Sequence, residues 1–420
     1  MRRFQITLEI SDKSFYNFLM FKRQIENKVK SLMQEYFSVT LFGSRQCGKT
    51  TLAKSLFPTF SYANLEEMNI RSLAKNDPQE FFTRFPEPVI IDEIQRAPEL
   101  LSSVQVRIDE SQKKGQYIIT GSQQISLKST VSQSLAGRTA IVQMLPLSIS
   151  ELQKENIELD RDTQLISGGM PYLFTQKGLI PFEYYKNYVS TYLERDVAQI
   201  GAVQDLMRFE NFMRLLAGRT GQLVNNSALA GEIGVSSTTI GSWLSILESS
   251  HLVYILKPWY MNRTSQVVKT PKVYFCDTGL ASYLLGIETP EQMQRDPLLG
   301  NLFENLVVVE AVKSRLNSGA EPNLFFFRNS KGLEIDLILQ EANRLKLFEV
   351  KSGKALNDEF TKNMEKFRGI YADHLADSSV KGTVIYSGEN FESFKSYSFM
   401  NFHKIDSLFR KTSKPFRLMF

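Results

Sequence analysis

The sequence has few of the residues that build sulfur- or imidazole-based sites. Among 420 residues there are two cysteines, Cys47 and Cys276, and three histidines. Two cysteines cannot form a disulfide framework or a Cys-rich zinc site, and the scattered histidines do not suggest a His-based metal centre. Apolar runs fall far short of the ~20 residues that span a bilayer, and charges interrupt the N-terminal segment before a signal peptide could form. We therefore expect a soluble cytoplasmic protein without a membrane partner.

The chain also has little net charge, but what it has is unevenly placed. The total is +5, from 50 basic and 45 acidic side chains. Residues 1–30 and residues 206–275 each carry seven basic and three acidic side chains, and residues 394–420 carry six and one. Such asymmetry points to a polyanionic partner such as DNA, although an uneven scatter of surface lysines would look the same.

The order of expected elements predicts an α/β multidomain protein. Strands are expected at residues 38–42, 60–64, 89–92, 116–120 and 139–144, with helices at 49–56 and 98–111 between them. This alternation is typical of a parallel sheet. Helices dominate residues 151–249. From residue 272 strands return, at 272–275, 324–328, 334–339, 346–350 and 383–386, with a long helix at 300–316.

A phosphate-binding motif follows the first expected strand. Residues 43–50 read GSRQCGKT, which matches GxxxxGK[ST] between a strand and a helix. Glycines let the backbone N–H groups face phosphate oxygens, Lys49 can reach the β- and γ-phosphates, and Thr50 can hold Mg²⁺. The motif predicts ATP and Mg²⁺ as ligands. The residues expected at the nucleotide are Gly43, Ser44, Arg45, Gln46, Cys47, Gly48, Lys49, Thr50 and Thr51.

Two further strand ends carry polar residues that suit ATP hydrolysis. The apolar run Val89–Ile91 ends in Asp92 and Glu93. In a P-loop enzyme the first acid binds Mg²⁺, directly or through water, and the second orients the attacking water. The run at 117–119 ends in Thr120, Gly121 and Ser122, and either hydroxyl could touch the γ-phosphate or the water.

These motifs resemble those of a known ATPase family. The segments GSRQCGKTTL, VIIDEIQRAPEL, YIITGS, LAGRTAIVQMLPLSISEL and GGMPYL are similar to the AAA-type P-loop ATPases of bacteria and archaea. More closely, they resemble the family that joins such an ATPase to a C-terminal domain of unknown function. The likeness runs from about residue 23 to beyond residue 352.

The resemblance implies roles for several residues. Asp92 and Glu93 become the Walker B pair, and Ser122 takes the sensor 1 position. Arg138 stands where related ATPases carry an arginine finger, acting within one subunit or across an interface, and a plain surface arginine is the alternative. The helical segment after residue 151 departs from the pattern, since only Arg195 is a candidate for sensor 2.

Residues 206–270 resemble a winged helix. A helix, a capped helix, a turn at Gly234 and a second helix capped by Ser236 or Ser237 are followed by a β-like run at 251–259 that would form the wing. Basic residues there could contact phosphates, whereas the presumed recognition helix is polar but uncharged. Domain packing is therefore as good an interpretation as DNA binding. The basic residues after Ser250 are Lys257, Arg263, Lys269 and Lys272.

The C-terminal region carries a carboxylate pattern that resembles the PD-(D/E)xK nuclease superfamily. Strand alternation puts Asp336 on one face of its strand and Glu349 with Lys351 on one face of the next, and Glu304 would reach in from a helix. Converging carboxylates of this kind would bind Mg²⁺ and activate water for phosphodiester attack. An inactive fold with acid–base pairs at its strand ends is the alternative.

Together these patterns predict five units: an N-terminal basic segment (1–30), a P-loop AAA-like ATPase core (31–150), a helical lid (151–205), a winged helix (206–270) and a restriction-endonuclease-like α/β domain (271–420). The leading hypothesis is a Mg²⁺-dependent ATPase coupled to DNA. The alternatives are a nucleotide-gated switch for a protein partner or for a homo-oligomer, and an ATP-regulated DNA nuclease.

Overall fold

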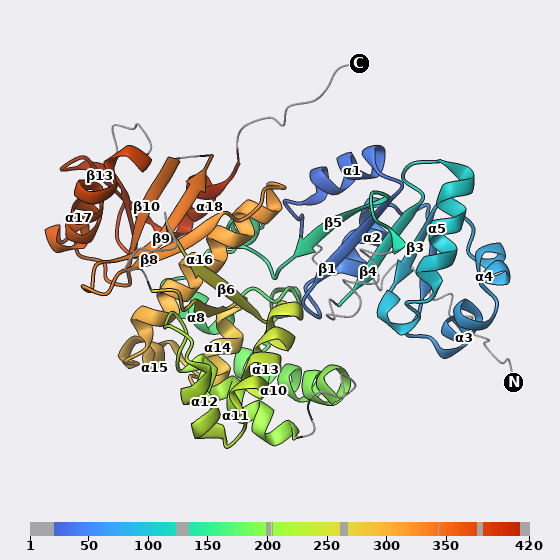
Figure 1. Cartoon of the computed structure of the whole chain (residues 1–420), viewed down its shortest axis with the longest axis horizontal. Helices are drawn as coiled ribbons and strands as arrows, with labels where there is room; N and C mark the ends of the chain where they lie inside the picture. The colour runs from blue at the N-terminus through green and yellow to red at the C-terminus, as the bar shows by residue number, and fades with distance from the viewer. Residues whose placement is uncertain are drawn as a thin grey trace, which may run out of the picture.

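The computed structural model describes residues 21–122, 134–198, 203, 205–260, 268–342, 344–375 and 381–411. Figure 1 shows an N-terminal α/β lobe and a C-terminal α/β lobe, with the helices of the middle of the chain packed below them. No helix in the described ranges is both long and apolar enough to cross a membrane.

The N-terminal lobe is a parallel sheet covered on both faces, as the alternation of elements predicted. Its strand order is β2-β3-β4-β1-β5, and every pairing is parallel. Alternate residues of β3 point to opposite cores: Ile90 faces α1 and α2, whereas Val89 and Ile91 face α3, α4 and α5. The elements are α1 Glu26–Glu35, β1 Ser38–Gly43, α2 Lys49–Leu56, β2 Ser61–Asn64, α3 Met68–Asn76, α4 Pro78–Arg84, β3 Val89–Asp92, α5 Leu100–Ser111, β4 Tyr117–Gly121 and β5 Thr139–Met144.

The helices of the middle region share one large apolar core with the C-terminal helix α16 (Leu299–Asn317). The predicted helix–turn–helix is present: Asn225 caps α12, Gly234 has a φ of +77°, and the Ser236 hydroxyl accepts a bond from the Thr239 N–H (3.0 Å). The other helices are α7 Ile149–Lys154, α8 Arg161–Ser167, α9 Tyr172–Thr175, α10 Pro181–Tyr192, α11 Leu206–Ala217, α12 Asn226–Ile233, α13 Ser237–Ser249, α14 Thr278–Leu284 and α15 Pro290–Arg295.

The C-terminal lobe is an eight-stranded mixed sheet in the order β12-β13-β11-β10-β9-β8-β6-β7. The helix α17 packs against one face, while α16 and α18 pack against the other. The strands and remaining helices are β6 Val253–Pro258, β7 Lys272–Phe275, β8 Leu324–Arg328, β9 Glu334–Glu341, β10 Arg344–Lys351, α17 Lys362–Tyr371, β11 Thr383–Tyr386, β12 Phe391–Phe394, β13 Tyr397–Asn401 and α18 Ile405–Phe409.

The predicted wing does not stand free. β6 pairs antiparallel with β7, but its last residues, Lys257 and Pro258, also pair with β8. The hairpin therefore extends the C-terminal sheet, and the predicted boundary at residue 270 falls inside it. One result is that Lys272, expected on the wing surface, is buried. Arg263 lies outside the described residues.

Candidate functional site

The loop between β1 and α2 has the backbone shape that its glycines predicted. Gly48 has a φ of +98° and precedes the first residue of α2, where unpaired helix N–H groups face the loop. A Cβ on Gly43 would lie 2.1 Å from the Met144 carbonyl oxygen, so only glycine fits between β1 and the end of β5. The Lys49 Nζ donates to the carbonyl oxygens of Gly43 (3.0 Å) and Ser44 (2.9 Å). These contacts hold the Lys49 ammonium over the loop. None of the described ion pairs gives it a carboxylate partner.

Asp92 lies at the centre of a set of hydroxyl groups. Its carboxylate accepts bonds from Thr50 Oγ1 (2.9 and 3.1 Å), from the Tyr62 hydroxyl (2.8 Å) and from Thr120 Oγ1. Burial and the adjacent Asp92 carboxylate raise the pKa of Tyr62, so its hydroxyl keeps its proton and donates. Carboxylate and hydroxyl oxygens are the ligands that Mg²⁺ prefers, and a P-loop site needs few of them because the phosphates supply others. The residues present fit a magnesium ion.

Glu93 lies next to this centre, and its backbone is held in an uncommon conformation. Its φ is +60°, and its N–H donates to Thr120 Oγ1 (3.2 Å). The Gln95 Nε2 donates to the Glu93 carboxylate and to Ser122 Oγ (3.0 Å). Thr120 therefore belongs to the Asp92 side of the site and Ser122 to the Glu93 side.

A cavity of about 880 Å³ adjoins the loop on the side of the middle helices. One wall comes from the loop and α2, and the other comes from α9 and α10. The Tyr184 hydroxyl donates to Gln46 Oε1 (2.6 Å), and its ring stacks on Tyr172 with centroids 6.1 Å apart. The lining also includes Phe21, Arg23, Gly48, Thr51, Leu52, Leu147, Ile180 and Tyr188.

Arg23, in the turn before α1, fastens the loop to the segment after β5. Its guanidinium donates to the carbonyl oxygens of Cys47 (2.8 Å) and Leu145 (2.8 Å), and it pairs with Glu151 (3.0 Å). Burial alone would raise the pKa of Glu151, but Arg23 and backbone N–H groups hold it below its ordinary value. Both side chains are buried, so the pair is part of the interior and not a surface contact.

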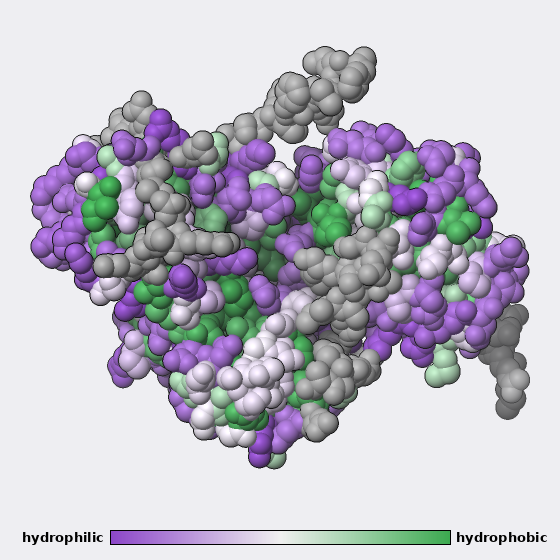
Figure 2. Space-filling view, in the orientation of Figure 1, coloured by the Kyte–Doolittle hydropathy of each residue, from purple (hydrophilic) through white to green (hydrophobic). Residues whose placement is uncertain are grey.

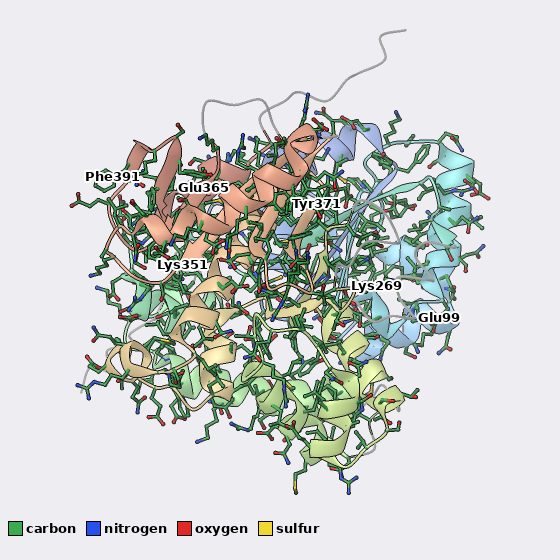
Figure 3. The ribbon with its side chains drawn as sticks, turned by 60° about the vertical axis from the view of Figure 1, so that its left-hand side comes forward. Glu99, Lys269, Lys351, Glu365, Tyr371 and Phe391 are labelled. Atoms are coloured by element: carbon green, nitrogen blue, oxygen red, sulfur yellow. The ribbon has the colours of Figure 1, made fainter. Side chains whose placement is uncertain are left out.

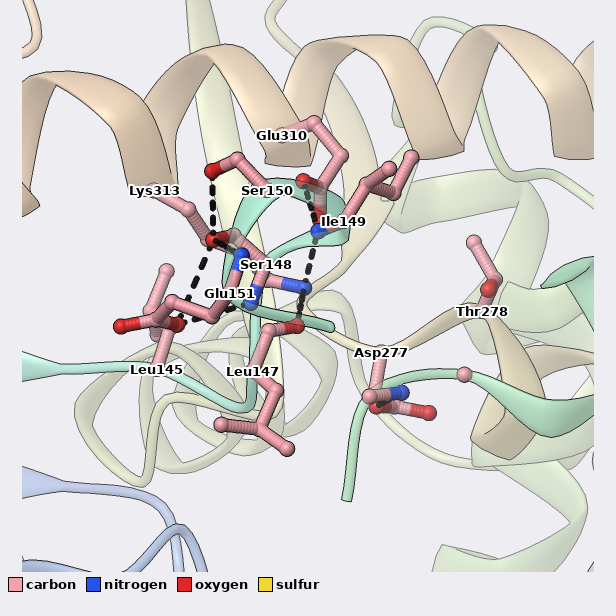
Figure 4. A network of polar contacts seen from close by, with 12 residues as sticks. Leu145, Leu147, Ser148, Ile149, Ser150, Glu151, Asp277, Thr278, Glu310 and Lys313 are labelled. Carbon is pink, nitrogen blue, oxygen red and sulfur yellow. Dashed lines mark hydrogen bonds and ion pairs between the residues drawn. The ribbon is translucent and has the colours of Figure 1, made fainter. Parts of the chain in front are cut away.

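The segment after β5 is bonded in turn to helix α16. Lys313 Nζ donates to the Leu147 carbonyl oxygen (2.9 Å) and pairs with Glu310 (2.8 Å), and Glu310 accepts from the Ile149 N–H (2.8 Å). Figure 4 shows these contacts beside the capping box of Ser148 and Glu151. A chain of buried polar contacts thus runs from the loop through Arg23 to α16, which spans the C-terminal lobe.

The sequence did not single out Arg23, Tyr62 or Gln95. Gln95 lies only two residues after Glu93, so a search of the turn after the Walker B pair could have found it. Tyr62 stands in β2, whose neighbour in the sheet is β3, and the strand order was needed to place it. Arg23 contacts Glu151 across 128 positions, and nothing local in the sequence indicates that pairing.

Arg138 lies at the amino-terminal end of the parallel strands, whereas the loop lies at their carboxyl-terminal end. Thr139 pairs with Ser38 at the start of β1, whereas the loop begins at Gly43, which pairs with Met144. The Arg138 guanidinium forms two bonds to Asp109 (2.7 and 2.8 Å). It cannot reach a nucleotide in its own loop, so only a role across a subunit interface stays a prediction. The side chain of Arg195 lies outside the described residues.

The structure brings the four predicted C-terminal residues together, but with lysines between them. Lys272 Nζ lies 2.9 Å from Glu304 and 2.7 Å from Glu334, and Lys351 Nζ lies 2.8 Å from Glu349 and 3.8 Å from Asp336. Among the described residues, no group of three or more histidine, cysteine or acidic side chains is arranged to hold a metal ion. Ammonium groups therefore lie beside all of these carboxylates, and a second Mg²⁺ site among them stays a prediction.

Burial governs the protonation of this cluster. Burial, followed by the nearby Asp336 carboxylate, raises the pKa of Glu349 to about 8. Glu349 Oε2 is buried and accepts no hydrogen bond from the described residues. Burial alone would lower the pKa of Lys272, but the surrounding carboxylates raise it, so this lysine stays charged. Lys351 is labelled in Figure 3, on the C-terminal side of the molecule away from Glu99 of the N-terminal lobe.

Three profiles of known domains match successive parts of the chain. Residues 35–153 match the profile of an AAA domain, residues 158–291 a domain of unknown function (DUF8612), and residues 299–405 another domain of unknown function (DUF4143). The match to the AAA profile covers the loop and the Walker B strand. This part of the chain is a P-loop domain of AAA type.

Whole proteins and solved structures resemble this chain at low sequence identity. Uncharacterized proteins of Mycobacterium bovis and Mycobacterium tuberculosis are each 29% identical over 336 residues, which cover 79% of this chain and 74% of theirs. The Walker-type ATPase of Pyrococcus abyssi has a TM-score of 0.40 at 14% identity, over 63% of this chain and 96% of that one. DnaA of Aquifex aeolicus, bound to AMPPCP, has a TM-score of 0.28 at 14% identity, over 53% and 85%.

Proposed function

We propose that the N-terminal lobe binds ATP with Mg²⁺ and hydrolyses it. The observation that carries this proposal is the contact of Thr50 with Asp92, which brings the end of the loop to the end of β3 with Glu93 alongside. The loop N–H groups and Lys49 would bind the phosphates. Thr50 and Asp92 would hold Mg²⁺, which neutralises phosphate charge when bound.

The chemistry assigned to the residues of this chain is a single displacement. Glu93 accepts a proton from a water molecule as the water oxygen bonds to the γ-phosphorus. The bond from the γ-phosphorus to the bridging oxygen breaks, and ADP keeps the electron pair. Lys49 stabilises the negative charge that builds on the phosphate oxygens.

The adenosine part of ATP fits the adjoining cavity. The cavity begins at Gly48 and Thr51, beside the place where the loop would hold the phosphates, and Tyr172 and Tyr184 offer aromatic rings for a base. Its volume of about 880 Å³ lies in the range of small-molecule sites, ~300–1,000 Å³. The Gln46–Tyr184 bond closes the cavity near the loop.

Steady-state hydrolysis of ATP with Mg²⁺ tests the proposal. We expect wild-type turnover to vanish when EDTA removes Mg²⁺, and Glu93→Gln to lower kcat by about 10²–10³-fold while ATP still binds. Glu99→Gln is the matched control, since Glu99 lies a few residues further along, is 48% exposed and forms a surface ion pair with Lys75 (3.3 Å). A Glu93→Gln protein with wild-type turnover would refute the assignment.

A second candidate function is a nucleotide-gated switch with slow turnover. The contact that favours it is Arg23, which touches the loop at Cys47 and the Glu151 carboxylate that leads to α16. A change in loop shape on binding ATP would act directly on this buried pair. The Arg23→Lys protein should bind ATP but lose any ATP-dependent change in protease sensitivity of the middle region. If ATP changed the protease sensitivity of Arg23→Lys as it changes that of the wild type, the switch would be refuted.

Contact with DNA stays a prediction that rests on the basic residues after Ser250, of which Lys257 and Lys269 are exposed, whereas the presumed recognition helix α13 offers little to it. Its exposed residues Ser237, Thr238 and Ser242 are small and uncharged, and Figure 2 shows pale surface over the α12–α13 region. Hydroxyl groups can bond phosphates, but this face lacks the amide or guanidinium groups that read bases. If DNA binds here, it should raise ATP turnover without sequence preference, and unchanged turnover would remove this partner.

A further inference from the structure

The carboxamide of Gln95 lies between two residues of the hydrolytic side of the site. Gln95 belongs to the 3₁₀ turn Ile94–Arg96, which follows β3 directly. Its Nε2 donates to the Glu93 carboxylate and to Ser122 Oγ (3.0 Å). These three side chains come from the ends of two neighbouring strands, β3 and β4. One amide group therefore fixes the spacing between a proton acceptor and a hydroxyl.

The other polar atom of the same amide has no partner among the residues that the structure describes. Gln95 Oε1 is buried and makes no hydrogen bond within the described residues. Buried carbonyl oxygens are nearly always bonded, to protein or to an ordered water. A water molecule between Glu93 and Ser122 would satisfy this oxygen by donating to it.

The conformation of Glu93 shows that its position is held from outside. A φ of +60° is uncommon for a residue with a side chain as long as glutamate. Such conformations cluster at functional sites and persist where the surroundings hold them. Here the Thr120 hydroxyl holds the backbone N–H of Glu93 (3.2 Å), and Gln95 holds its carboxylate.

We infer that Gln95 is a positioning residue for ATP hydrolysis: its N–H groups hold Glu93 and Ser122 on two sides of the attacking water, and its Oε1 accepts a hydrogen bond from that water. The inference rests on the proposed ATPase function and adds to it the residue that sets the geometry of attack. Gln95 donates no electrons and no protons to the reaction. The proton of the water still passes to Glu93.

The test compares Gln95→Leu with the wild-type full chain. Leucine keeps most of the volume but removes the amide, so kcat should fall about 10- to 100-fold, as expected when a reacting group is misplaced. The Kd for a non-hydrolysable ATP analogue should stay within about twofold, since Gln95 contacts neither the loop nor the cavity lining. Gln79→Leu, an exposed glutamine on α4, is the matched control and should keep wild-type kcat and Kd.

Two further variants separate positioning from folding. Gln95→Glu keeps the shape but replaces the donor with a carboxylate that repels Glu93, and it should lose as much kcat as Gln95→Leu. Because Gln95 and Glu93 would hold the same water molecule, the loss of kcat in the double variant Glu93→Gln/Gln95→Leu should be smaller than the two single losses combined. Additive losses would overturn the inference.

The outcomes also distinguish this inference from the proposal beneath it. Wild-type protein without Mg²⁺-dependent turnover would refute the ATPase proposal and the inference with it. Wild-type turnover that Gln95→Leu and Gln95→Glu both retain would refute only the role of Gln95. A fall in kcat with unchanged analogue binding supports it.

Discussion

The P-loop site and the C-terminal cluster use the same residue types in opposite ways. Each has a buried lysine near carboxylates that lie close to strand ends. Within the described part of the chain, Lys49 contacts neutral carbonyl oxygens of its own loop, so its charge is available for an anionic ligand. Lys272 lies between Glu304 and Glu334, so its charge is already neutralised. The same residue types therefore make a ligand site in one lobe and a closed ionic cluster in the other.

The difference teaches how such patterns should be judged. A buried carboxylate without a partner is costly, so a protein supplies a cation from its own chain unless a ligand supplies one. At Asp92 the partners are hydroxyl groups, which a metal ion can join or replace. In the C-terminal cluster two ammonium groups join the partners, beside the Tyr274 hydroxyl at Glu304 and the Val350 N–H at Asp336. Motif spacing alone does not distinguish the two cases.

The largest expected effect is on the free energy of unfolding when the buried lysine of each site is replaced. Lys272→Met should lower the free energy of unfolding by about 3–5 kcal/mol, because buried Glu304 loses its ammonium partner and keeps the bond from the Tyr274 hydroxyl (2.6 Å). Glu334 is partly exposed and keeps Arg328 (3.6 Å), so it should contribute less to the loss. Lys49→Met should cost about 1 kcal/mol, since it removes only bonds to loop carbonyls. Urea denaturation measures both.

Lys346→Met is the control for that experiment. Its partner Glu341 is 41% exposed and Lys346 is 48% exposed, so the loss should stay below about 1 kcal/mol. If Lys272→Met were no more destabilising than Lys346→Met, the view of a closed ionic cluster would be wrong.

An intermediate effect is expected at the cavity beside the loop. Tyr184→Ala removes the ring proposed for the base and should weaken ATP binding about 2- to 10-fold. Tyr184→Phe keeps the ring and loses only the bond to Gln46 (2.6 Å), so it should bind almost as the wild type does. Calorimetric titration with a non-hydrolysable analogue measures both affinities, and equal affinities for wild type and Tyr184→Ala would place the base elsewhere.

The smallest expected effect is a pH dependence of the C-terminal cluster. The pKa of Glu349 is raised to about 8, above its ordinary value of 4.5. The folded chain therefore binds more protons than the unfolded chain between these values, and stability falls as the pH rises through that window. The glutamine of Glu349→Gln cannot ionise. The thermal midpoint of this variant should therefore fall less between pH 5 and pH 8.5 than that of the wild type, by about 1–3 °C. Identical slopes would show that Glu349 does not titrate in this window.

The sequence predicted the parallel sheet of the N-terminal lobe for a physical reason. Parallel strands place their carboxyl ends at one edge, so the loop after β1, the acids after β3 and the hydroxyls after β4 had to meet. The order of strands along the sequence is enough to predict that these segments meet. The closeness of Thr50 and Asp92 follows directly from it.

The C-terminal half was harder because its cluster depends on a long-range pairing. The run at 251–259 was expected to form a free wing, with Lys272 among the nearby basic residues that could contact phosphates. Pairing of β6 with β8 brings the hairpin into the sheet and buries Lys272 beside Glu334. Arg23 and Glu151 were missed for the same reason, since only the folded chain brings them together.

The claim that the P-loop hydrolyses ATP is tested most directly by measuring ATP turnover in the wild type and in Lys49→Ala. DNA is present in these samples, and its cleavage is scored at the same time. The account predicts Mg²⁺-dependent turnover that Lys49→Ala abolishes, and no cleavage by either protein. Turnover that survives in Lys49→Ala would contradict the role of the P-loop. DNA cleavage by the wild type that is lost in Asp336→Ala would contradict the closed ionic cluster.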